Sequence, residues 1–315
     1  MELYKVGRKI KEERIRKKIS QEELCYGICS VSTLSRIEND TQKPTLKIEE
    51  ALLEKLGCST ENLVFYAGED EIAKHNLETE LTVLTMHRKP LGNKLEEYKK
   101  LIDDNSSSHM EKQFALMTEA IWALYSESWE LSQVQAQLEE ALLLTMPDYE
   151  ERELVTVKLL TLTEITILNN LAIVKYKQDN FGEAIEIMHY LIGYLEKGDL
   201  STDTSGKKYP LLVYNLAKMT QQSNDFEKML FLCEKGITFC KNYMRLVALP
   251  EFLYYKAVAC SQLNRLQEAK ESCEYAITLH KLLGNLEMAK KLQAYCEQHL
   301  LTDNYKENPD QESLI

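Results

Sequence analysis

The sequence after Gly68 repeats one unit: an amphipathic segment, a short polar turn and a second amphipathic segment. In three units an alanine of the first segment is followed twelve positions later by a residue of the second segment. The pairs are Leu171-Ala172 with Ala184, Leu216-Ala217 with Met229, and Lys256-Ala257 with Ala269. Small side chains let paired helices approach closely, and no pair buries its apolar side without a neighbour. With only 11 Gly and 6 Pro in 315 residues, the sequence predicts an all-α protein, most of it a solenoid of helical hairpins.

Hydrophobic periodicity predicts eleven helices in this part of the chain. We expect them at 70–87, 90–103, 110–126, 130–146, 149–178, 181–197, 209–223, 226–242, 248–263, 266–281 and 285–301, with a loop at 198–208. The hairpins resemble degenerate tetratricopeptide repeats, about five of them between residues 72 and 282, followed by a capping helix. That resemblance implies a right-handed stack whose concave face is lined by the first helix of each pair.

Residues 1–67 predict a separate small helical domain. Leu3, Val6 and Ile10 lie on one helical face, and eight basic residues fall between positions 5 and 18. Ser20 opens a capping box with Glu23, which begins a second short helix. The domain carries a net charge of +1 and the remainder of the chain −13. A polyanion would therefore be attracted to the N-terminal domain and repelled by the remainder.

This domain resembles the Xre/Cro-type helix-turn-helix family in "SQEEL", "STLSRIEN", "KPTLKIEEALLEKLG" and "ENLVF". The resemblance implies five helices, the third of which enters the major groove of double-stranded DNA. Carried over by position, it implies phosphate contact for Gln21, base contacts for Val31, Ser32 and Thr33, backbone contacts for Arg36 and Lys43, and an internal pair between Arg14 and Glu38. Two alternatives stay open. Ser30 either faces the DNA with these residues or only caps the helix, and Val31 is either exposed or partly buried. Leu24 and Ser35 are eleven positions apart, one fewer than is commonest in that family.

Asn170 and Asn215 occupy the same place in successive repeats, each within the sequence Asn-Leu-Ala. Their carboxamides could pair with the backbone of an extended peptide. Tyr255 and Lys256 hold the neighbouring place in the next repeat, and Lys89, in the turn of the first hairpin, could hold a peptide carboxylate. Alternatively, the two Asn side chains bond to an adjacent helix and only align the repeats.

The combination resembles the PlcR-like branch of the peptide-sensing RRNPP regulators, most closely in "ICSVSTLSRIEN", "YNLAK" and "LYYK". It implies a cytoplasmic homodimer whose solenoid binds a short signalling peptide and thereby repositions two DNA-binding heads. We expect a DNA-binding domain at 1–67, a linker helix at 68–87 that couples the two parts, repeats at 88–302 and a polar tail at 303–315. The alternative function is a DNA-binding regulator whose solenoid docks a partner protein without a peptide signal.

Other function classes find little support in the sequence. It contains no phosphate loop, dinucleotide fingerprint, GxSxG or HExxH motif, so we expect neither enzymatic activity nor a cofactor. No apolar stretch approaches the roughly 18 residues of a membrane span, which predicts no membrane association. The 8 cysteines include no CxxC, and we expect reduced core thiols; Cys25 and Cys29, four apart, should pack in the core and not bind metal.

Overall fold

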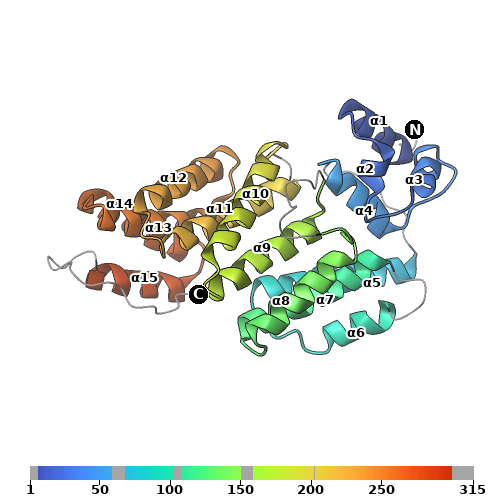
Figure 1. Ribbon diagram of the computed structural model, residues 1–315. Helices are drawn as coiled ribbons and strands as arrows, with labels where there is room; N and C mark the ends of the chain where they lie inside the picture. Colours follow the sequence, from blue (N-terminus) through green and yellow to red (C-terminus); the bar gives the residue numbers. More distant parts are fainter. Residues whose placement is uncertain (1–5, 59–67, 103–107, 150–158, 202, 300–315) are drawn as a thin grey trace. The chain divides into compact units, whose positions relative to one another are not determined.

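The computed structural model describes residues 6–58, 68–102, 108–149, 159–201 and 203–299, and within these ranges it is built of helices and contains no strand (Figure 1). The chain divides into two compact units, Met1–Ser205 and Gly206–Ile315, each of which is described by itself. No helix in the described ranges combines the length and the apolar character that a membrane crossing requires.

Four short helices form the N-terminal domain: α1 (Val6–Arg16), α2 (Gln21–Cys25), α3 (Val31–Glu38) and α4 (Leu46–Lys55). The side chains of Ser20, Ser30 and Thr45 each accept a backbone N–H at the start of the helix that follows, which satisfies a donor that the helix itself leaves free. Fully or nearly fully buried side chains of all four helices form one core, among them Ile10, Leu24, Leu34, Ile37, Leu52 and Leu53. The expected fifth helix at "ENLVF" lies outside the described residues.

The first unit continues with three helical hairpins: α5 (Glu69–Met86) with α6 (Lys94–Ile102), α7 (His109–Ser126) with α8 (Leu131–Leu143), and α9 (Leu162–Lys177) with α10 (Phe181–Glu196). Neighbouring hairpins also pack on one another, through α6 with α7 and α8 with α9. The prediction of a helix at 149–178 was wrong at its start. Residues 159–161 are not helical, and Thr161 caps α9 by accepting from Glu164 N–H; residues 150–158 lie outside the described ranges.

The second unit contains α12 (Phe226–Asn242), α13 (Leu249–Gln262), α14 (Leu266–Leu282) and α15 (Leu286–His299), and α11 (Asp203–Thr220) runs into it from the first unit. The expected loop at 198–208 was wrong, because α11 begins at Asp203 and contains Pro210. Polar residues before a proline are typical of a loop, but here the helix continues through Pro210.

The small residues of the repeated unit are buried as the sequence predicts. Ala172, Ala184, Ala217, Met229 and Ala257 are 0% exposed, and Ala269 is 1% exposed. The burial of these residues is therefore confirmed, and two of the three expected pairs of helices, α9 with α10 and α13 with α14, pack on each other. The expected tail at 303–315 lies outside the described residues.

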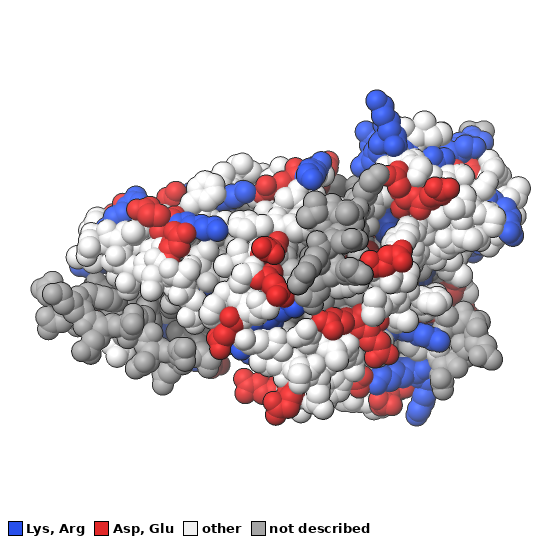
Figure 2. All heavy atoms as spheres, in the orientation of Figure 1, with Lys and Arg blue, Asp and Glu red and all other residues white. Residues whose placement is uncertain are grey.

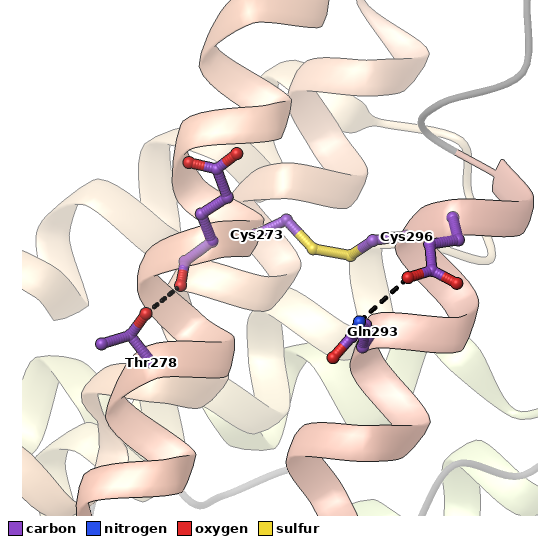
Figure 3. The surroundings of a disulfide bond; sticks show 6 residues. Cys273, Thr278, Gln293 and Cys296 are labelled. Atoms are coloured by element: carbon purple, nitrogen blue, oxygen red, sulfur yellow. Dashed lines mark hydrogen bonds between the residues drawn. A yellow bond between two sulfur atoms is a disulfide. The ribbon is translucent and has the colours of Figure 1, made fainter.

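One expectation about the cysteines is corrected. Cys273 on α14 and Cys296 on α15 form a disulfide, with their Cα atoms 6.8 Å apart (Figure 3). The bridge joins consecutive helices that pack on each other, which is why residues 23 positions apart in sequence come within bonding reach. Cys25, by contrast, is buried in the N-terminal core and Cys29 packs against that core, as expected.

Candidate DNA-binding and ligand-binding sites

Helix α3 has one buried and one open face. Leu34 and Ile37 are 0% and 1% exposed and enter the core, whereas Val31 is 40% exposed on the outer face. Val31 is therefore not one of the buried residues, which decides one of the alternatives left open by the sequence. An exposed apolar side chain beside small polar ones is the kind of surface that can approach base edges.

Hydroxyl groups surround the start of α3. Ser30 is exposed and caps the helix, since its Oγ accepts from Thr33 N–H at 3.1 Å. The same oxygen lies 2.9 Å from Ser32 Oγ and 2.9 Å from Thr33 Oγ1. This network orients three hydroxyls at an exposed helix N-terminus, where backbone N–H groups also favour phosphate.

The expected pair between Arg14 and Glu38 is confirmed. Arg14 Nε donates to Glu38 Oε1 at 2.6 Å, and Arg14 Nη2 donates to Oε2 at 3.0 Å. Gln21 Nε2 donates to the same Oε2 at 2.8 Å. Burial would raise the pKa of Glu38, but the hydrogen bonds from Arg14 and Gln21 outweigh it and lower that pKa. Gln21, expected to touch a phosphate, thus helps to fix α3 against α1 and α2.

Positive charge surrounds this surface. Arg36 and Lys43 are exposed, and Arg36 Nη1 donates to Gln42 Oε1 at 3.3 Å. Figure 2 shows Lys and Arg side chains gathered over α1, with acidic side chains on the neighbouring surface. Such a distribution attracts a phosphate backbone without reading its sequence.

The turn between α2 and α3 contains a glycine that no other residue could replace without strain. Gly27, at φ +70°, provides the left-handed residue directly after the short α2. A Cβ at this glycine would lie 2.0 Å from the carbonyl oxygen of Thr145. The glycine is therefore required both by the turn and by the close approach of the turn that follows α8.

Within the first unit, the N-terminal domain is held to the repeats by polar contacts. It contacts α5, the segment after α8 and the first residue of α9. The contacts are Lys47–Glu78 at 2.5 Å, His75–Glu50 at 3.5 Å, Glu71 Oε1 with Leu46 N–H at 3.2 Å, Tyr26 O–H with Asp148 at 3.2 Å, and Glu54 with Leu162 N–H at 3.0 Å.

Helix α5 also binds its hairpin partner α6 and the first helix of the next hairpin, α7. Lys74 Nζ lies 3.0 Å from Glu111 on α7, and Tyr98 O–H on α6 donates to Glu78 at 2.5 Å. Because Glu78 also pairs with Lys47 of α4, one carboxylate connects the N-terminal domain to the first hairpin. This is the geometry that a coupling helix needs.

A buried polar chain reaches the same junction from the repeats. Gln113 Nε2 donates to Thr145 Oγ1 at 2.7 Å, and Thr145 O–H donates to Glu164 at 2.8 Å. Lys55, 4% exposed, donates to the carbonyl of Tyr26 at 2.7 Å. Burial lowers the pKa of Lys55, and the charge of Glu164 partly offsets that effect. The junction is thus polar, and Gln113, Thr145, Glu164 and Lys55 are buried within it.

The side chains proposed to hold a peptide are less accessible than the sequence suggests. In the first unit, Asn170 is 4% exposed; its Nδ2 donates to Thr166 O at 2.8 Å on its own helix, and its Oδ1 has no hydrogen-bond partner. Lys89 is exposed in the turn after α5. In the second unit, Asn215 and Tyr255 are 9% and 6% exposed, and Lys256 lies 3.1 Å from Glu234.

One pocket in the second unit was missed by sequence reasoning, apart from Tyr255. It is lined by side chains of α11, α13, α14 and α15: Tyr214, Glu251, Tyr254, Tyr255, His280, Met288 and Leu292. Tyrosines at helical spacing are usually core residues, so they did not indicate a pocket. The only sequence feature that pointed to this pocket was "LYYK", which contains Tyr254 and Tyr255. Among the described residues, no group of three His, Cys, Asp or Glu side chains converges as a metal ion requires.

Two family models match the chain. One, described as helix-turn-helix, matches residues 10–63, and the other, described as the RNPP family C-terminal domain, matches residues 78–300. No curated protein matches the sequence at a significant level.

Several solved structures share the fold over nearly the whole chain. PlcR of Bacillus thuringiensis, solved with the peptide PapR7 and DNA, is 19% identical, with a TM-score of 0.57 over 95% of this chain and 99% of that one. ComR of S. thermophilus, solved with DNA and its signalling peptide ComS, is 17% identical, with a TM-score of 0.52 over 93% and 99%. The SHP pheromone receptor Rgg2 of Streptococcus dysgalactiae is 15% identical, with a TM-score of 0.51 over 93% and 99%.

Proposed function

Because the chain belongs to the RNPP family, we propose that it is a sequence-specific DNA-binding transcriptional regulator controlled by a short signalling peptide. The helix-turn-helix match at residues 10–63 supplies the first half of this proposal and the repeat match at 78–300 the second. PlcR and ComR, which share the fold, were each solved with DNA and a peptide. By the same reasoning the chain acts in the cytoplasm as a homodimer and is not an enzyme.

For DNA we assign the open face of α3. Val31, Ser32 and Thr33 face base edges, Ser30 adds a hydroxyl beside its capping role, and Arg36 and Lys43 hold the phosphate backbone. The exposure of Val31 and Arg36 supports this assignment. Gln21 donates one N–H of its side-chain amide to Glu38, and its second amide N–H can donate to a phosphate.

For the peptide we assign Asn170 and Lys89 in the first unit, and Asn215, Tyr255 and Lys256 in the second. The buried Oδ1 of Asn170, which lacks a hydrogen-bond partner, supports a role beyond packing, because such a group normally finds a partner. Since Asn170, Asn215 and Tyr255 are at most 9% exposed, peptide entry must move the surrounding helices. That movement gives the peptide a means to favour one arrangement of the repeats over another.

A homodimer would place two copies of α3 about 34 Å apart, so that they reach adjacent major grooves. Helix α5 is the element through which the repeats act on this spacing, because its side chains bind α4 on one side and α6 and α7 on the other. One observation supports the proposal most strongly: the same chain contains a helix α3 with an exposed outer face and a repeat domain of the RNPP family.

The DNA half is tested by selecting duplexes from a random-sequence pool with the full chain. We expect a two-part operator whose half-sites are about one helical turn apart. Recovery of no preferred sequence, while circular dichroism shows a folded protein, would contradict the assignment of α3.

The peptide half is tested on the selected duplex. Its dissociation constant is measured with and without a pool of random heptapeptides, and we expect a change of at least fivefold. Equal affinities, together with retention of a partner protein from lysate by the repeat domain, would favour the docking function over the peptide signal.

A further inference from the structure

The pocket of the second unit lies among four helices of the repeats and is partly open to solvent. Tyr214 comes from α11, Glu251, Tyr254 and Tyr255 from α13, and Met288 and Leu292 from α15, with His280 of α14 completing the wall. Its cavity is about 20 Å³, enough for one group the size of a water molecule.

Glu251 brings an uncompensated carboxylate to this pocket. Its Oε2 is buried and has no hydrogen-bond partner. Burial raises the pKa of Glu251, a backbone hydrogen bond partly offsets this effect, and no charged side chain contributes. A buried acidic group without a counter-charge is unfavourable, and a cation entering the pocket would relieve that penalty.

The aromatic wall is held in a fixed arrangement. The ring centroids of Tyr214 and Tyr255 are 5.4 Å apart at an interplanar angle of 80°, and those of Tyr254 and Tyr255 are 5.2 Å apart at 74°. Tyr254 also packs edge-on against Tyr295 of α15, at 5.5 Å. Tyrosine rings attract cations, and three of them line the same pocket as the Glu251 carboxylate.

His280 does not oppose this charge. The side chain is 3% exposed, and burial lowers its pKa. The imidazole is therefore neutral near pH 7 and can accept a hydrogen bond through one ring nitrogen. An ammonium group, with three N–H donors, would find acceptors in Glu251 and His280 and ring faces beside them.

Size narrows the class of ligand. A guanidinium is much larger than a water molecule, whereas a primary ammonium is comparable to one. We propose that this pocket is a subsite for a primary ammonium group of the ligand that the repeat domain binds. The inference rests on the proposed peptide response, and the ammonium can come from a free N-terminus or from a lysine side chain.

The pocket is tested directly with methylammonium chloride on the full chain, observed through the ¹³C-labelled methyl group of Met288, at constant ionic strength. We expect a saturable shift of the Met288 resonance. The shift should be absent with methanol, which is neutral, with acetate, which is negative, and with tetramethylammonium, which is too large. Met117, in the first unit, is the control methyl group.

Two variants connect the shift to the proposed groups. Glu251→Gln should weaken methylammonium binding at least tenfold, and Tyr254→Leu, which keeps apolar bulk but removes the ring face, should weaken it severalfold. Unchanged resonances elsewhere would show that both variants fold. A shift that survives Glu251→Gln in a folded protein would overturn the proposal.

Peptide pools distinguish the two sources of the ammonium. Random heptapeptides are captured by the full chain with free or acetylated N-termini, and with lysine present or replaced by arginine. Loss on acetylation assigns the N-terminus, and loss on replacement assigns the side chain. If neither acetylation nor the replacement of lysine reduces capture, and methylammonium does not shift Met288, the ammonium subsite is overturned while the peptide response stands. A Met288 shift without capture of any pool would contradict the peptide response instead.

Discussion

Glu49 on α4 is 6% exposed, and its Oε1 has no hydrogen-bond partner. Burial raises its pKa to about 7; Lys43 opposes this effect, whereas Glu50 and Glu71 reinforce it. Since the folded-state pKa exceeds the ordinary value of 4.5, the unfolded chain loses this proton first. Stability should therefore fall as pH rises from about 4.5 to about 7 and stay level above that range.

Glu49→Gln removes the titrating group and should raise the thermal unfolding midpoint of the N-terminal domain at pH 8, but hardly at pH 4. One pKa unit corresponds to about 1.4 kcal/mol, which sets an upper limit of about 3 kcal/mol. Glu12→Gln, at an exposed position of α1, controls for the loss of one charge. Equal gains at both pH values would mean that the packing of Gln, and not ionisation, is responsible.

Arg36 is exposed at the last turn of α3, where it would meet phosphate and not bases. Arg36→Gln should weaken binding to all duplexes by a similar factor and reduce the slope of log K against log salt by about one. Titrations at four salt concentrations on selected and random duplexes measure both quantities. Lys290→Gln, at an exposed position of α15, should leave both the affinity and the salt slope unchanged. If Arg36→Gln weakens binding to the selected duplex only, Arg36 contacts a base.

Among the helices, α15 is joined to α14 by a disulfide. It contributes Met288 and Leu292 to the pocket and Tyr295 to the aromatic wall. Much of its surface is open, including Leu286 at 60% exposed. Packing alone therefore gives it less support than an internal helix receives, and the link between Cys273 and Cys296 adds a covalent constraint.

Cys296→Ser should increase amide hydrogen exchange throughout α15. A 23-residue loop closure corresponds to about 3 kcal/mol in the chain-entropy account of disulfides. Dithiothreitol should reproduce the effect in the unaltered chain and add nothing to the variant. Gln293→Ala changes the same helix at an exposed side chain whose amide bonds only Glu297 (Figure 3); if it raises exchange as much as Cys296→Ser, the bridge does not hold α15 in place.

Features that depend on residues close together in sequence could be predicted. Sites formed by residues that are far apart in sequence and meet only in the folded chain could not. The capping box at Ser20 and the burial of Ala172 and Ala184 depend on short spacings, and both are found. The disulfide and the pocket bring together residues that no spacing relates, such as Tyr214, Glu251 and Met288. The start of α11 at Asp203 was missed because its first residues lack the apolar periodicity on which the prediction relied.

At the scale of the whole molecule, the junction between the N-terminal domain and the first hairpins sets the condition for signalling. Glu78 bridges Lys47 and Tyr98, and Gly27 leaves no room for a side chain against Thr145. A packed junction with paired polar groups changes between discrete arrangements more readily than by continuous deformation. A peptide alters DNA binding only if it binds one of these arrangements more tightly.

That condition makes a thermodynamic prediction. If the peptide changes operator affinity by some factor, the operator must change peptide affinity by the same factor, which we expect to lie between about 5 and 150. Calorimetric titration of peptide into the free protein and into the saturated protein–operator complex measures one side, and operator titration with and without peptide measures the other. Glu78→Gln, which weakens the contact of α5 with α4, should reduce both factors together and leave the intrinsic affinity for either ligand less affected. Unequal factors at equilibrium would show that the peptide acts through oligomerisation or another linked step, and unchanged factors in Glu78→Gln would exclude α5 as the connecting element.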